Sequence, residues 1–92
     1  MEELSFLRQA PGPGFTCTTV RIEPGRSRLY DAAEWRDALV VVEAGEVQLE
    51  CRHGARRPFA RGSVLCLDGL KLRALHNLGD EKVLLVAVAR LR

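Results

Sequence analysis

The chain has 92 residues, of which 47% are hydrophobic and 28% are charged, and its formal net charge is +2. This length and composition are typical of one folded domain and exclude a disordered chain or a pair of domains. A charge this close to balance does not favour binding to nucleic acid, and the longest apolar run, residues 83–89, is much too short for a helix that spans a membrane. We therefore expect neither nucleic acid nor a membrane among the partners.

The cysteines predict the compartment. Cys17, Cys51 and Cys66 are odd in number and widely spaced, so they form neither a CxxC pair nor a disulfide framework. Residues 1–14 contain no apolar stretch of the kind that a secretory signal peptide needs. Thiols stay reduced in the cytoplasm, and we expect a cytoplasmic location.

Strand and turn signals follow one another along nearly the whole chain. Residues 1–14 are an N-terminal arm that ends in a Pro/Gly cluster, and residues 15–92 are the main domain. Alternating apolar and β-branched residues, separated by turns rich in Gly, Asp and Pro, predict strands at residues 16–22, 39–42, 47–52, 58–60, 63–67, 72–76 and 82–90. Short strands at this spacing predict an all-β sandwich or barrel.

Two segments decide how these strands connect. Residues 29–37 fit either a strand with its loop or a single helical turn. The apolar runs 39–42 and 47–52 flank Ala44 and Gly45, so we expect a hairpin that turns at these two residues.

The last predicted strand is apolar on both faces. One face carries Val83, Leu85, Ala87 and Ala89, and the other carries Leu84, Val86 and Val88. Such a strand is covered on both sides, by the core on one side and by a second sheet, the N-terminal arm or a second subunit on the other. A domain this small builds only a modest core by itself, and we expect a homodimer.

The turn spacing resembles the first of the two signature motifs of the cupins. That motif is a glycine, two histidines one residue apart, a glutamate and a closing glycine. Gly25 and Gly45 match its two ends, and the segment from Val42 to Val47 is similar to cupin sequence. The three metal-ligand positions of the motif fall on Asp31, Ala33 and Ala38.

The second cupin motif is matched in the same way. Gly62 and Asn77 fit its two ends, and Asn77 opens a turn that is again similar to cupin sequence. Asp68 and Leu70 stand at its proline and glycine positions, and Arg73 stands at its histidine position. The resemblance covers about residues 16–90 and implies an all-β, small cupin-like barrel, also called a double-stranded β-helix or jelly roll.

The resemblance also implies a metal site, and the residues at its positions do not suit one. Cupins hold the metal with imidazole and carboxylate groups that point into the barrel, and a divalent metal needs three or four such donors. Only Asp31 carries a donor, because Ala33 and Ala38 have none and Arg73 is a permanent cation. We expect neither a metal nor another cofactor.

The same positions give a candidate ligand site. Arg73 and Asp31 are expected to pair inside the barrel, either as a structural ion pair or with Arg73 binding a carboxylate or phosphate of a ligand. Tyr30 and Trp35 lie beside the first motif and are expected to wall a pocket or to pack at its rim. The leading interpretation is a metal-free, cupin-type binding protein for a small polar, anionic or sugar-like molecule.

Two other classes stay open. The first is an enzyme, either an isomerase or epimerase that uses Tyr30 and Asp31 as acid and base or a metal-dependent oxygenase. The second is a structural or interaction module whose barrel is filled by Val, Leu and Ala side chains. A zinc site is a further alternative with a spacing that matches no standard motif, and it would be built from Cys51, His53, Cys66 and His76.

Overall fold

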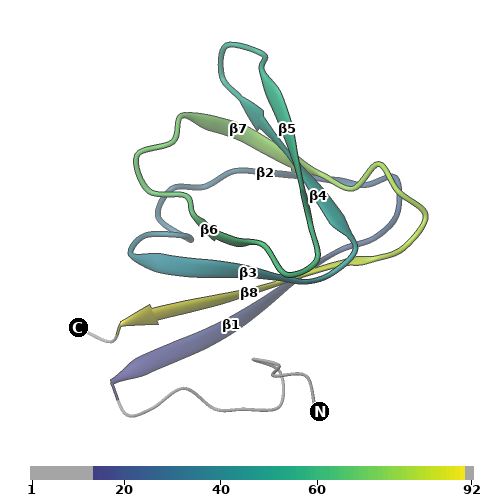
Figure 1. Ribbon diagram of the computed structural model, residues 1–92. Helices are drawn as coiled ribbons and strands as arrows, with labels where there is room; N and C mark the ends of the chain where they lie inside the picture. The colour runs from purple at the N-terminus through teal and green to yellow at the C-terminus, as the bar shows by residue number, and fades with distance from the viewer. Residues whose placement is uncertain (1–13, 91–92) are drawn as a thin grey trace.

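The computed structural model describes residues 14–90 (Figure 1). Residues 1–13 of the predicted arm and residues 91–92 lie outside the described residues, so the boundary between arm and barrel stays a prediction. The described part is all β and contains no helix, and thus none that could cross a membrane. Its strands are β1 (Phe15–Ile22), β2 (Ser27–Leu29), β3 (Ala38–Ala44), β4 (Glu46–Cys51), β5 (Arg56–Ala60), β6 (Val64–Cys66), β7 (Leu72–His76) and β8 (Val83–Arg90).

The strands form two four-stranded antiparallel sheets. The strand order is β1-β8-β3-β6 in the first, which we call sheet A, and β2-β7-β4-β5 in the second, sheet B. In Figure 1 the two sheets face each other as two layers, and the chain passes repeatedly from one to the other. This is the small jelly-roll barrel that the sequence predicts.

The interior of the barrel is filled with apolar side chains. Ala38, Val40 and Val42 alternate on β3, and Val47 and Leu49 alternate on β4 across the interior. All five are at most 4% exposed and belong to one buried cluster with residues of β1, β7 and β8. A binding site in this domain therefore lies at an end of the barrel or on its surface.

Every predicted strand is present, and the ambiguous segment 29–37 is now assigned. Strand β2 ends at Leu29, and residues 32–37 form turns rather than a helix. The last strand is present as β8, which lies inside sheet A between β1 and β3. The predicted cover of its outer face is only partial, because Val86 is 0% exposed but Leu84 and Val88 are half-buried.

The predicted hairpin at Ala44 and Gly45 is wrong. Strand β3 pairs with β8 and β6, whereas β4 pairs with β5 and β7, so Gly45 is where the chain leaves sheet A for sheet B. Gly45 has a left-handed φ of 74°, and a Cβ atom there would lie 2.5 Å from the carbonyl oxygen of Lys82. Alternation along a strand shows which side chains share a face, but it does not show which strand is the partner.

Candidate functional site

In the folded chain, the residues at the cupin metal-ligand positions do not form a set of metal donors. Asp31 and Ala33 lie in the loop after β2, and Ala38 is the first, buried residue of β3. Arg73 lies on β7 and adds a positive charge. Within residues 14–90 no group of three or more His, Cys, Asp and Glu side chains is arranged to hold a metal ion. The residues present do not fit the metal that the cupin fold implies.

Arg73 lies at an irregularity between β4 and β7. Glu50 pairs with Ala74 but Cys51 pairs with Leu72, so the register shift leaves Arg73 without a partner residue on β4. Its side chain is exposed, and its Nη2 donates to the carbonyl oxygen of Arg52 at 3.0 Å. Arg73 is also one of the charges that lower the pKa of Glu50, so its guanidinium acts on the surroundings of that carboxylate.

The expected pair between Arg73 and Asp31 does not form. Asp31 Oδ1 instead accepts the N–H of Ala33 at 3.0 Å, a local turn contact, and among the described residues no ion pair joins Asp31 to Arg73. The structure thus does not pair the two charged residues of the predicted site. A ligand-binding role for each of them stays a prediction.

Tyr30 contacts both Arg73 and the core, and its phenol lies near carboxylates. Its N–H donates to the carbonyl oxygen of Arg73 at 2.9 Å, and its half-buried ring packs against the core. Burial raises the pKa of the phenol most, followed by the nearby carboxylates of Asp68 and Asp31 and then by Cys66. The phenol is therefore protonated at neutral pH and lies beside two carboxylates at one end of the barrel.

Trp35 is part of the core rather than a pocket wall. It is 1% exposed and belongs to the buried cluster. Its indole N–H has no hydrogen-bond partner among the described residues. An unpaired buried donor costs free energy, so Trp35 stabilises the fold through the apolar area that its ring buries and not through a hydrogen bond.

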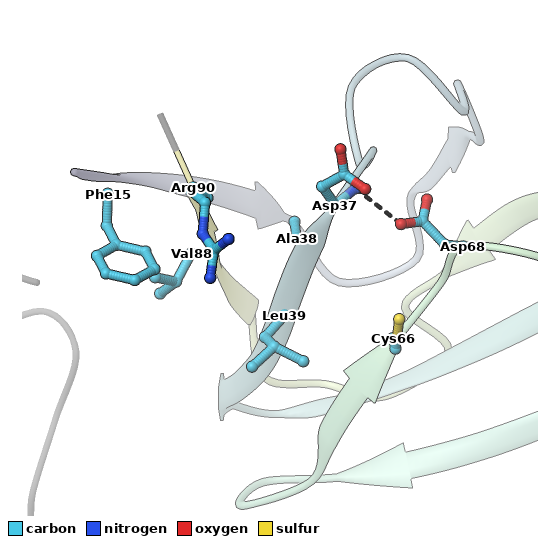
Figure 2. Close-up of a pocket in the computed structure, with 8 residues that line it drawn as sticks. All are labelled: Phe15, Asp37, Ala38, Leu39, Cys66, Asp68, Val88 and Arg90. Atoms are coloured by element: carbon cyan, nitrogen blue, oxygen red, sulfur yellow. Dashed lines mark hydrogen bonds between the residues drawn. The ribbon is translucent and has the colours of Figure 1, made fainter. Parts of the chain in front are cut away.

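A pocket of about 610 Å³ adjoins this end of the barrel (Figure 2). Its apolar surface comes from Phe15, Ala38, Leu39 and Val88, and its polar groups are Asp37, Cys66, Asp68 and Arg90. Figure 2 shows the two aspartates together on one side and Arg90 near Phe15 on the other. The pocket thus combines an apolar floor with charges of both signs, as binding sites for small polar molecules do.

Asp68 connects the pocket to Tyr30. Its Oδ2 accepts the N–H of Asp37 at 2.7 Å, and Asp37 has a left-handed φ of 58° that few residues other than glycine adopt. The same carboxylate raises the pKa of Tyr30. The sequence placed Asp68 only at the proline position of the second motif, because an aspartate before a glycine is common in turns and carries no further signal.

The zinc alternative is wrong. Cys51 lies at the end of β4 against the core and His53 lies in the following turn. Cys66 is exposed on β6 of sheet A, whereas His76 lies on β7 of sheet B with its ring bonded to Ser27 and Glu50. Within residues 14–90 no metal-binding group of three side chains includes them.

Titration of the phenol tests this electrostatic description. Tyr30 is the single tyrosine of the chain, so phenolate absorbance reports on it alone. We expect a titration midpoint above the ordinary value of about 10. Asp68→Asn should lower the midpoint, because it removes the charge that raises the pKa of Tyr30 most while keeping the side-chain shape. Because the pKa is raised in the folded state, its stabilising contribution is complete below about pH 10 and is lost as the pH rises through the folded pKa. An unchanged midpoint in Asp68→Asn would contradict the proximity of the two groups.

Comparisons with known proteins agree with the fold. No protein-family model matches the sequence, and no curated protein matches it. Among solved structures, a Cupin 2 conserved barrel domain protein from Salinispora arenicola is 27% identical with a TM-score of 0.63, over 85% of this chain and 67% of that chain. The chain belongs to the cupin superfamily.

Two further structures extend the comparison. A sugar phosphate isomerase of the cupin superfamily from Silicibacter pomeroyi is 25% identical with a TM-score of 0.58, over 84% of this chain and 51% of the isomerase. The Cupin_2 domain of an XRE family transcriptional regulator from Enterobacter cloacae shares the fold at 20% identity and a TM-score of 0.63, over 86% of this chain and 84% of that domain. The chain spans about half the length of the isomerase.

Proposed function

We propose that this protein is a cupin-type binding protein that holds a small polar molecule without a metal ion. The observation that carries the proposal is the pocket of about 610 Å³ beside the barrel end, where Asp37 and Asp68 lie across an apolar floor from Arg90. The residues at the family's metal positions support a metal-free mode of binding, because three of the four cannot donate to a metal.

The charges of the pocket favour one kind of ligand. Carboxylates accept hydrogen bonds, so Asp37 and Asp68 select hydroxyl or ammonium groups, and Arg90 selects an acceptor or an anion. A molecule with hydroxyl groups and at most one negative charge, such as a sugar, a sugar phosphate or a zwitterion, fits this distribution. Arg73 is not among the residues that line the pocket, so anion binding by Arg73 would need a separate site.

Amide chemical shifts of the labelled chain test the proposal. The probes are glucose, a glucose phosphate and free alanine, which are neutral, anionic and zwitterionic. We expect at least one probe to shift the amide signals of Asp37, Leu39 and Asp68. Asp68→Asn should weaken that binding about tenfold or more, because a hydrogen bond to a charged group contributes about 1.5–3 kcal/mol.

The matched control is Asp80→Asn, which makes the same change at an exposed aspartate in the turn between β7 and β8. It should leave the affinity unchanged. The proposal is refuted if no probe of the three shifts the pocket amides, or if both asparagine variants bind as the original chain does.

The enzyme alternative rests on Tyr30 and Asp68. A protonated phenol and a carboxylate close to each other supply an acid and a base, and the similar protein from Silicibacter pomeroyi is a sugar phosphate isomerase. An isomerase of this kind exchanges a carbon-bound hydrogen of a sugar phosphate with solvent. Deuterium uptake that is lost in Tyr30→Phe would favour the enzyme, and its absence would favour binding alone.

We also propose that the protein is a homodimer. The outer face of sheet A keeps three large apolar side chains exposed: Phe15 at 43%, Leu39 at 56% and Val64 at 61%. Phe15 and Leu39 also line the pocket, so a partner on this face would cover the pocket. Apolar surface of this kind is typical of a protein interface. Sedimentation of the purified chain should give the dimer mass, and Val64→Glu should shift the mass towards the monomer. The cytoplasmic location stays a prediction.

A further inference from the structure

The outer face of sheet B carries a hydrogen-bonded serine, histidine and glutamate. Ser27 Oγ lies 2.6 Å from Nδ1 of His76, and Nε2 of His76 lies 2.8 Å from Oε1 of Glu50. The three residues come from β2, β7 and β4, which are neighbouring strands in that order. The pairing of Ser27 with His76 places them directly opposite each other, so the contact follows from the strand register.

The surroundings fix the role of each ring nitrogen. The hydrogen bond from His76 is the main cause that lowers the pKa of Glu50, with Arg56 and Arg73 as further causes. Glu50 is therefore an anion at neutral pH and accepts the proton of Nε2. Nδ1 is then the acceptor for the hydroxyl of Ser27. Arg56 holds the carboxylate from the other side, with Nη2 at 3.7 Å from Oε1 of Glu50.

Ser27 is exposed to solvent, whereas His76 and Glu50 are nearly buried, and this difference suits a nucleophile. The side chains of His76 and Glu50 are only 13% and 15% exposed, so their contact is shielded from water. Ser27 is exposed on β2, the three-residue strand at the edge of sheet B. The hydroxyl oxygen is thus the atom that a molecule from solvent reaches first.

We propose that Ser27 is an activated nucleophile that takes up an acyl or phosphonyl group from an activated ester, with His76 as its general base and Glu50 as the residue that positions His76. The arrangement meets the geometric requirement for such a nucleophile, in which the base is within hydrogen-bond reach and is itself oriented by a third group. The site lies on sheet B and does not depend on the pocket beside sheet A.

The chemistry balances with water as the second reactant. Oγ of Ser27 forms a bond to the acyl carbon while its proton passes to Nδ1 of His76. The bond from that carbon to the leaving alcohol then breaks, and the alcohol takes the proton from His76. Water attacks the acyl-serine in the same way, which releases the carboxylic acid and restores Ser27.

A fluorophosphonate probe and the full chain test the proposal. With this probe the bond from Oγ to phosphorus forms and fluoride leaves. We expect one adduct per chain in the intact mass, mapped to Ser27 by peptide sequencing. His76→Gln should slow labelling about a hundredfold or more, which is the usual contribution of a general base. Ser63→Ala is the matched control at another serine and should label at the original rate.

Glu50→Gln separates positioning from a structural role. Glutamine keeps the side-chain shape but does not hold the imidazole as the carboxylate does. The rate constant of labelling at saturating probe should therefore fall, while the probe concentration that gives half of that rate and the circular dichroism spectrum stay unchanged. The proposal is overturned if the folded chain gains no adduct, if the adduct maps elsewhere, or if folded His76→Gln labels as fast as the original chain.

Discussion

Gly45→Ala is expected to destabilise the domain by about 3 kcal/mol or more, a large part of the stability of a domain this small. Two costs add at this position. The φ of 74° is unfavourable for a residue with a side chain, and the new Cβ would lie 2.5 Å from the carbonyl oxygen of Lys82. That oxygen belongs to the backbone just before β8, so it cannot move away as a flexible side chain would. Urea unfolding of the two proteins measures the difference.

Gly25→Ala is the control that separates the two costs. Gly25 has almost the same φ, 76°, but a Cβ there meets nothing within 4 Å. Its replacement should cost only the conformational part, about 1–2 kcal/mol. Equal losses for the two variants would show that the close approach of Gly45 to Lys82 is absent.

Asn77→Ala is expected to cost about 3 kcal/mol. Asn77 is 0% exposed, and its Nδ2 donates to the carbonyl oxygens of Ile22 at 2.9 Å and Glu81 at 2.7 Å. Its Oδ1 accepts the N–H of Gly79 at 3.0 Å. Alanine would leave these backbone groups without their partner, and each unsatisfied buried group costs about 1–3 kcal/mol before water compensates some of them.

Leu78→Ala is the neighbouring control. Leu78 is 65% exposed, and its truncation should change the free energy of unfolding by less than about 0.5 kcal/mol. Similar losses at positions 77 and 78 would mean that this turn does not depend on the amide of Asn77.

Gly45 and Asn77 explain how much of the fold could be predicted. Each is the last residue of one of the two cupin motifs. A side chain at Gly45 would collide with the backbone of Lys82. The side-chain amide of Asn77 donates hydrogen bonds to two backbone carbonyl oxygens. Turn residues and apolar alternation are local properties, so the strands and the barrel could be predicted from them. The partner of each strand is not local, which is why a crossing between sheets at Gly45 was expected to be a hairpin.

The candidate sites were harder to predict because they depend on register. Counting residues along a motif assumes a regular strand, but the shift between Glu50 and Cys51 leaves Arg73 outside the regular pairing. The contact of Ser27 with His76 joins residues 49 positions apart, and that of His76 with Glu50 spans 26. Without the strand order of sheet B, nothing in the sequence connects these three residues.

The metal content of the chain, purified without a histidine tag, shows whether this cupin barrel binds a metal although three of its four motif positions carry no metal donor. Elemental analysis should find less than about 0.1 transition-metal ion per chain, because too few donors converge within residues 14–90 to retain one. A content near one metal ion per chain would show that the barrel does bind a metal, with ligands from residues that the described fold keeps apart.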